Sequence, residues 1–508
     1  MIKHFVGDHK QSFNLKVASL NVVENMSDPT FDRKSASFLE WFKALPGATF
    51  HPDIKIEDFR GKGAGRGIVT TADIPEDTVL FTIPRTAIIN TQTSDLPSRI
   101  PQAFATTGLE DTDNEADEDG SETSGPPDNW ALLILIMIYE YLQGDKSRWK
   151  PYFDVLPAQF ETLMWWSDQE LVELQASSIV SKIGKDEADG MFRAKVLPVI
   201  HEHAEVFYPE GSVRLGEDQL LTLAHLMGST IMAYAFDLEN DDDEADDENE
   251  DEWMEDKEGT LMMGMVPMAD ILNADAEFNA HVNHDEDSLT VTTLRAIPAG
   301  AEILNYYGPL GNGELLRRYG YVTDRHARYD VTEISWDLIL SVLKETLILD
   351  EVAWGKAINE LDLEEIEDAF VIERDSGEPD SRGEFNAEAA VKELPSDLIE
   401  QIHTILKEVR KISPTTIPDK AVRDEITLIA IHRALELRLA QYPTNQIIDF
   451  DLLSGNKVSG RQKMAVVVRW GEKVLLQEAL DFAQEKVLKV KSRAGQESEP
   501  HAKRQRTR

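Results

Sequence analysis

The sequence predicts an α+β protein in which a β-rich region encloses a helical insert and precedes an all-α C-terminal domain. Strand-like runs rich in β-branched residues lie in two separate places, around residues 70–80 and 289–307. Between them, residues 130–232 show the apolar spacing of helices, and this spacing returns after Tyr321. Two β regions separated by helices indicate one domain with an insert, and the later helices indicate a second domain.

These patterns divide the chain of 508 residues, which is long for a single hydrophobic core. We expect a disordered segment over 1–30, a β-rich domain over 31–330, a helical domain over 331–490 and a basic disordered tail over 491–508. Within the β-rich domain, the helical insert spans 130–236, and acidic disordered loops span 109–128 and 237–259. The second loop is either a solvated loop or a clamp for a basic partner. The tail is either a nuclear-import signal or a disordered end without such a role.

The composition excludes several classes of protein. There is no cysteine, so disulfides and thiolate zinc sites cannot form. His281 and His284 lack the spacing of a zinc motif, and we expect no metal site. The first thirty residues lack the apolar core of a signal peptide, and the longest apolar run, Trp130–Tyr139, is too short to span a bilayer. We therefore expect a soluble intracellular protein that acts as a monomer, without a membrane.

The net charge of −43 restricts the possible partners. Such a polyanion should not bind nucleic acid directly, whereas it should attract basic proteins and steer them at low salt. The alternative is that the acidic runs only aid solubility. A basic protein is the partner that the charge favours.

The N-terminal part combines a short helix with an unusual glycine segment. Ser35–Leu45 carries apolar residues at helical spacing and ends at a Pro-Gly pair. The segment Gly61–Gly67 follows, but it has neither phosphate-loop spacing, and β-branched residues rather than a helix come after it. The glycines either let the backbone lie against a ligand or form a plain loop.

An internal echo links the two β regions. TTADIPEDTVL at residues 70–80 and TLRAIPAGAEIL at 293–304 share a strand, an Ile-Pro turn and a second strand. This repetition predicts two similar hairpins, one before and one after the helical insert.

The stretch from Met265 to Val322 gathers an asparagine, paired tyrosines and several glycines. The strand-like runs Leu289–Leu294 and Glu302–Tyr307 flank a proline-glycine turn, and a short helix is expected over Gly313–Arg318. This composition is consistent with either a small-molecule pocket or a tyrosine-rich β corner.

Three motifs in this stretch carry a family resemblance. ADILN at residues 269–273, NYYG at 305–308 and ELLRRYGYV at 314–322 occur in an order that resembles SET-domain protein-lysine methyltransferases. The sequence is most similar to the Rubisco large-subunit methyltransferase branch, and within it to fungal ribosomal-protein lysine methyltransferases. The resemblance covers residues 36–330 well and the C-terminal third more loosely. It implies a β-rich SET fold around one pocket, and a helical domain that docks the substrate.

The resemblance also implies the cofactor S-adenosyl-L-methionine and a set of residues that bind it: Ala64, Gly65, Arg66, Tyr234, Asp270, Asn273, Ala274 and Tyr319. The first three match a segment whose backbone contacts the methionine end of the cofactor. Asn273 matches an asparagine that contacts the cofactor. Most of the family has histidine after this asparagine, so Ala274 removes a side-chain hydrogen bond near the adenine.

The chemistry of lysine methylation explains why tyrosines suit the site. The accepting amine must be neutral, although a free lysine has a pKa of about 10.4. A narrow apolar channel disfavours the ammonium form, and tyrosine rings supply such walls while their hydroxyls orient an amine. The resemblance assigns the catalytic role to Tyr307, and it assigns to Tyr319 the closing of both the lysine channel and the cofactor pocket.

These observations predict a protein-lysine N-methyltransferase that acts on a basic large-subunit ribosomal protein, in the nucleus and also in the cytoplasm. A histidine acceptor on the same scaffold is one alternative, and it would require a polar partner for the second ring nitrogen. A non-catalytic acidic chaperone for basic proteins is the other. The presence of Tyr307, Tyr319 and Asn273 argues against the chaperone.

Overall fold

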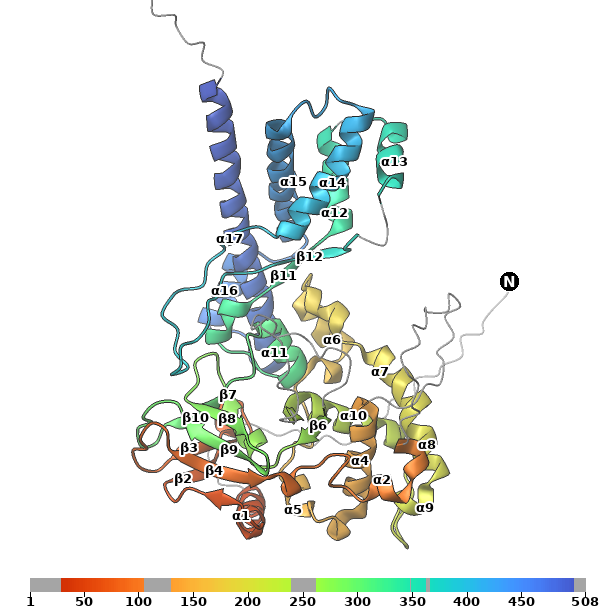
Figure 1. Cartoon of the computed structure of the whole chain (residues 1–508), viewed down its shortest axis with the longest axis vertical. Helices are drawn as coiled ribbons and strands as arrows, with labels where there is room; N and C mark the ends of the chain where they lie inside the picture. Colours follow the sequence, from red (N-terminus) through yellow and green to blue (C-terminus); the bar gives the residue numbers. More distant parts are fainter. Residues whose placement is uncertain (1–28, 105–128, 239–261, 348, 362–365, 498–508) are drawn as a thin grey trace, which may run out of the picture.

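The computed structural model describes residues 29–104, 129–238, 262–347, 349–361 and 366–497 (Figure 1). The predicted loop at 109–128, most of the loop at 237–259 and residues 498–508 of the tail lie outside these ranges. The structure combines two four-stranded sheets, a helical insert and a helical C-terminal region, which confirms the predicted fold class.

The strands of the β-rich domain form two sheets. The first has the order β1 (Thr49–Phe50), β4 (Val79–Pro84), β9 (Ser288–Thr293) and β8 (Ala280–His284), with antiparallel neighbours throughout. The second has the order β2 (Ile54–Asp58), β3 (Arg66–Thr70), β10 (Glu302–Asn305) and β7 (Asn273–Ala274), of which only β7 and β10 run parallel. Two small ribbons pair β5 (Ala235–Leu238) with β6 (Met262–Met265), and β11 (Thr332–Ser335) with β12 (Ala369–Ile372).

The two echoing segments are not hairpins, so that prediction is wrong. Within each segment, the two strands belong to different sheets. The segments pair with each other instead: β4 lies beside β9, β3 lies beside β10, and Ile74 and Ile297 exchange two backbone hydrogen bonds of 2.9 Å. Both isoleucines are buried, and their backbone groups bond to the other segment, so the chain crosses between sheets at each Ile-Pro step.

In Figure 1 most helices of the insert lie to the right of the two sheets, and α1 (Pro29–Ala44) lies below them. Helix α1 precedes the first strand, and the short helices α2 (Leu96–Arg99) and α3 (Pro101–Phe104) follow β4. The helices of the insert are α4 (Asn129–Gln143), α5 (Lys150–Phe153), α6 (Asp168–Leu171), α7 (Lys185–Met191), α8 (Leu197–Glu202), α9 (Ala204–Phe207) and α10 (Glu217–Tyr234). Helix α4 is apolar on all faces and is buried, as its sequence predicts. Its side chains share one core with both sheets.

The C-terminal region has a core of its own. Its helices are α12 (Trp336–Leu347), α13 (Glu351–Asn359), α14 (Ser396–Ile412), α15 (Lys420–Ala440), α16 (Gln446–Ser454) and α17 (Gly460–Glu497). Helix α17 continues beyond residue 490, so the beginning of the expected tail is helical. The first turns of α17 reach down to α11 (Asn312–Tyr319) in the β-rich domain, where Leu316 packs with Ala465 and Val468 (Figure 1). None of the described helices has both the length and the apolar content to cross a membrane.

Candidate active site

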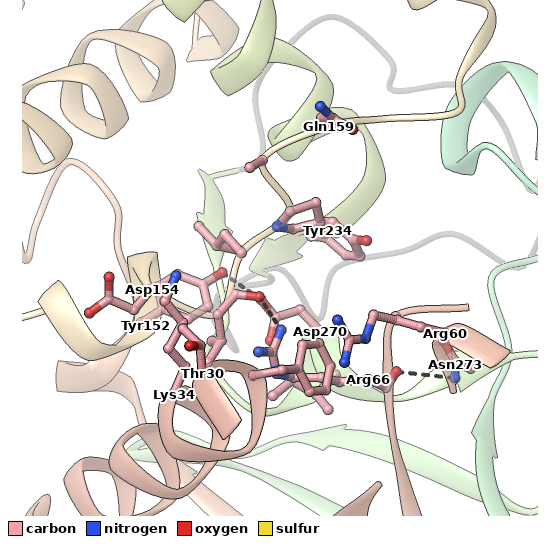
Figure 2. Close-up of a pocket in the computed structure, with 17 residues that line it drawn as sticks. Thr30, Lys34, Arg60, Arg66, Tyr152, Asp154, Gln159, Tyr234, Asp270 and Asn273 are labelled. Carbon is pink, nitrogen blue, oxygen red and sulfur yellow. Dashed lines mark hydrogen bonds between the residues drawn. The ribbon is translucent and has the colours of Figure 1, made fainter. Parts of the chain in front are cut away.

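A hollow of about 500 Å³ lies between the second sheet, the insert and the start of α1. Strand β3 contributes Arg66, the loop before it contributes Gly65, and the end of α10 contributes Tyr234. Asp270 and Asn273 enter from the segment that joins β6 to β7 (Figure 2). The fold therefore brings five of the predicted cofactor residues to one cavity.

One side of the hollow is cationic. The guanidinium groups of Arg60 and Arg66 both lie against the Phe31 ring, with Cζ 3.8 and 3.9 Å from its centroid. Arg66 donates hydrogen bonds to Ser35 Oγ and to the Val155 carbonyl, both at 2.8 Å, which fixes its position between α1 and the insert. Burial lowers the pKa of Arg66 to about 10, so it keeps its charge at neutral pH.

Asp270 forms a buried acidic group in the same wall. Its carboxylate accepts hydrogen bonds from the Tyr152 hydroxyl and from the Met268 N–H, the latter at 3.1 Å. These bonds favour the charged form, but burial dominates and raises the pKa of Asp270 to about 7. Burial and the neighbouring Asp270 also raise the pKa of Tyr234, which is therefore neutral. A cationic group that entered this space would favour the ionised form of Asp270.

Asn273 joins the strands beside the hollow. Its Nδ2 donates to the Arg66 carbonyl at 3.2 Å and to Glu302 Oε1 at 2.7 Å, so one amide links β7 to β3 and β10. A Cβ added to Gly67 would lie 2.8 Å from this Nδ2 and 2.7 Å from the Phe59 ring. Glycine at position 67 is thus required for the close approach of Asn273 to β3.

The tyrosines of the NYYG and RRYGYV motifs meet beside the hollow. The rings of Tyr307 and Tyr319 are stacked, with centroids 4.6 Å apart and planes 20° apart, and Tyr321 lies edge-on to Tyr319. The Tyr307 hydroxyl donates to the Leu272 carbonyl at 2.7 Å. Burial, with the nearby Tyr321 and Tyr319, raises the pKa of Tyr307 well above its usual range, so its phenol stays protonated.

Four predicted residues do not line the hollow itself: Ala64, Ala274, Tyr307 and Tyr319. Leu272 and Asn273 are adjacent in the chain, so the tyrosine pair lies against the segment that forms the wall. The N–H of Ala64 donates to the Phe59 carbonyl at 3.2 Å, and the backbone of Ala274 pairs with Asn305 of β10. These residues surround the hollow instead of forming its inner surface.

Part of the wall of the hollow was not predicted from the sequence. Thr30, Phe31 and Lys34 come from α1, Tyr152 comes from α5, and the chain from Asp154 to Gln159 follows α5. These residues reach the hollow only through tertiary packing, for which the sequence offers no local motif.

The chain is similar to known proteins. Residues 65–308 match the family model of the SET domain. The chain is 29% identical over 469 residues to ribosomal lysine N-methyltransferase 4 of Saccharomyces cerevisiae, covering 86% of this chain and 89% of the relative. It is 27% identical over 448 residues to human N-lysine methyltransferase SETD6, covering 83% and 85%. The chain therefore contains a SET domain over residues 65–308.

Solved structures share the fold of this chain. The SET domain of LSMT bound to lysine and AdoHcy superposes with a TM-score of 0.60 at 20% identity, covering 91% of this chain and 94% of that one. Rubisco LSMT bound to AdoMet superposes with a TM-score of 0.57. Within the SET family, the chain is a protein-lysine N-methyltransferase that uses S-adenosylmethionine. The predicted family, enzyme class and cofactor are confirmed.

The hollow fits this cofactor chemically. Its volume lies in the range of ligand pockets, which are typically about 300–1,000 Å³. The cations Lys34 and Arg66 match a carboxylate, whereas Arg60 is already paired with Asp58 at 2.7 Å. The buried carboxylate of Asp270 matches a cationic group. Both kinds of charge are present in the amino-acid part of S-adenosylmethionine, together with its sulfonium.

Proposed function

We propose that the hollow holds S-adenosylmethionine, and that the adjoining Tyr307–Tyr319 pair receives a lysine side chain from a basic large-subunit ribosomal protein. The stacked tyrosines beside a hollow with charges of both signs are the observation that carries this proposal. The named residues divide into those that hold the cofactor and those that prepare the amine.

The cofactor residues act through position and charge. The backbone of Ala64 and Gly65 lies at the entrance of β3, while Arg66 and Lys34 are placed to neutralise a carboxylate. Asp270, with Tyr234 beside it, is placed to take a cationic group. Asn273 holds the wall in shape. The backbone of Ala274 pairs with β10 beside it.

S-adenosylmethionine, when bound, supplies an electrophilic methyl group. The substrate lysine supplies the accepting amine, which must be neutral and lie in line with that methyl group. The aromatic walls of Tyr307 and Tyr319 disfavour the ammonium form of the lysine. The Tyr307 hydroxyl donates its proton in a hydrogen bond to the Leu272 carbonyl, so its oxygen can accept a hydrogen bond from an amine N–H. Its raised pKa excludes a tyrosinate base, and alignment with desolvation then provides most of the rate.

The choice of a ribosomal substrate rests on similarity and charge. The yeast relative carries a ribosomal substrate in its name, and it aligns with most of this chain. The net charge of −43 suits a basic protein. The basic sequence at the C-terminal end also supports action in the nucleus, and we propose that the enzyme works there as a monomer.

The test is methyl transfer to a separated large ribosomal subunit. Purified protein and labelled S-adenosylmethionine should label one basic protein, and mass spectrometry should place the label on a lysine. Tyr307→Phe should lose most of the transfer at unchanged cofactor affinity. Labelling of a histidine, or of no ribosomal protein while other basic proteins are labelled, would refute the proposed substrate.

A further inference from the structure

Asp330 is a buried carboxylate that the proposed reaction does not use. It lies between the 3₁₀ turn Arg325–Tyr329 and strand β11, and its exposed fraction is 4%. Its Oδ1 accepts hydrogen bonds from the backbone N–H of Asn312 at 2.9 Å and from Asn312 Nδ2 at 3.3 Å. Asn312 is the first residue of α11, so Asp330 binds the N-terminal end of that helix.

The second oxygen of Asp330 faces the C-terminal domain. Among the described residues, Oδ2 has no hydrogen-bond partner. A Cβ added to Gly471 of α17 would lie 2.1 Å from this oxygen, so no other residue type permits the two elements to approach so closely. Glycine is a poor residue inside a helix, and the close contact accounts for its presence in the middle of α17.

The contact is costly for stability. Burial raises the pKa of Asp330 to about 7, although the N–H of Asn312 and the charge of Arg374 oppose the rise. Glu472, next to Gly471, raises it further. A carboxylate with a raised pKa destabilises the folded state at neutral pH, so stability alone does not explain this residue.

Helix α11 connects this contact to the tyrosine pair. The helix is short, from Asn312 to Tyr319, and Asn312 also accepts a hydrogen bond from the Thr323 N–H at 2.9 Å. Its middle is packed against α17 through Leu316. Its last residue, Tyr319, stacks on Tyr307. A shift of α17 at Gly471 would therefore move the whole helix and the ring at its end.

We propose that Asp330 is a positioning residue, through which α17 of the C-terminal domain, at Gly471, sets the placement of Tyr319 against Tyr307. This inference rests on the proposed function of the tyrosine pair. The C-terminal domain then controls the rate of the chemical step, in addition to any role in docking the substrate. A purely docking role would change KM and leave kcat alone, and this difference makes the inference testable.

The first test compares two glycine substitutions in helices of the C-terminal domain. Gly471→Ala places a methyl group against Asp330, whereas Gly355→Ala in α13 meets no atom within 4 Å and is the matched control. For Gly471→Ala we expect a fall in kcat of at least tenfold, with KM for the protein substrate and cofactor Kd changed less than threefold. Amide hydrogen exchange in α11 should accelerate at least tenfold. Gly355→Ala should change none of these quantities.

Two further variants keep the inference falsifiable if Gly471→Ala does not fold. Asp330→Ala removes the acceptor for Asn312 and should lower kcat about tenfold. Asp330→Asn retains an oxygen acceptor of the same size, so it should restore kcat to within threefold of the wild type.

Specific results would overturn the inference. A folded Gly471→Ala protein with wild-type kcat and wild-type exchange in α11 would show that the contact does not position the helix. A rise in KM alone would show that α17 only docks the substrate. If the wild type transfers no methyl group, the proposed function fails. Hydrogen exchange in α11 still tests the coupling in that case.

Discussion

Replacing Tyr307 with phenylalanine separates the two roles of its hydroxyl. The ring remains, so stacking on Tyr319 should persist. In the wild type, the Tyr307 hydroxyl donates a hydrogen bond of 2.7 Å to the Leu272 carbonyl, and Leu272 is only 1% exposed. A buried carbonyl left without its donor costs about 1–3 kcal/mol, and the melting temperature should fall by roughly 2–8 °C.

The catalytic loss should be larger than the structural one. The hydroxyl oxygen is the group that orients the amine, so kcat should fall roughly ten- to a thousand-fold, which corresponds to about 1.4–4 kcal/mol in the transition state. Cofactor affinity should change little, because Tyr307 does not line the hollow. The assay is methyl transfer with separate kcat and KM, beside calorimetric titration of the cofactor and thermal unfolding.

Tyr321→Phe is the matched control. Its hydroxyl lies at a longer distance, 3.4 Å, from the Ala274 carbonyl, so it should lose little stability and retain kcat within about threefold. A folded Tyr307→Phe protein with wild-type kcat would show that Tyr307 is only a wall of the channel. The catalytic role would then pass to Tyr319.

Three other perturbations follow from the geometry. Gly67→Ala should push Asn273 away from β3 and weaken cofactor binding at least tenfold in calorimetry, unless the Phe59 ring yields. The pKa of Asp270 is about 7 in the folded protein, above its ordinary 3.8, so folding stability should fall as the pH rises from about 4 to 7. Asp270→Asn should not show this fall when the free energy of unfolding is measured over the same pH range. Equal pH profiles would contradict this. Deleting the acidic run from Asp241 to Glu252, which lies outside the described residues, should raise KM and flatten the salt dependence of kcat/KM. Unchanged kinetics at low salt would leave it a solubilising segment.

The sequence predicted the helices better than the pairing of the strands. Helix α4 is apolar on all faces, and α14 repeats apolar residues at helical spacing, so local pattern alone identifies both. The Ile-Pro segments also look local, and this suggested hairpins. Their partners lie on the other side of the helical insert, as the bridge between Ile74 and Ile297 shows. A strand pattern in the sequence predicts a β-strand, but it does not determine which other strand that strand pairs with.

The site residues likewise fall into those that a local sequence motif identifies and those that it does not. Asp270, Asn273, Tyr307 and Tyr319 come from one continuous stretch, so ordered motifs could identify them together. Tyr152 has no such motif, although its hydroxyl binds Asp270 from the insert. Residues of this second kind are set by tertiary packing, and the sequence alone does not reveal them.

Asn273 shows why the two echoing segments must pair with each other and not within themselves. Its single amide reaches the Arg66 carbonyl at the start of β3 and the Glu302 carboxylate at the start of β10. Those strands belong to different segments, and they adjoin only because each segment crosses between the two sheets. The pairing of β3 with β10 brings both acceptors within reach of this one amide. The wall of the hollow is therefore a product of the crossing, and Asn273 with Gly67 closes it at the point where the segments meet.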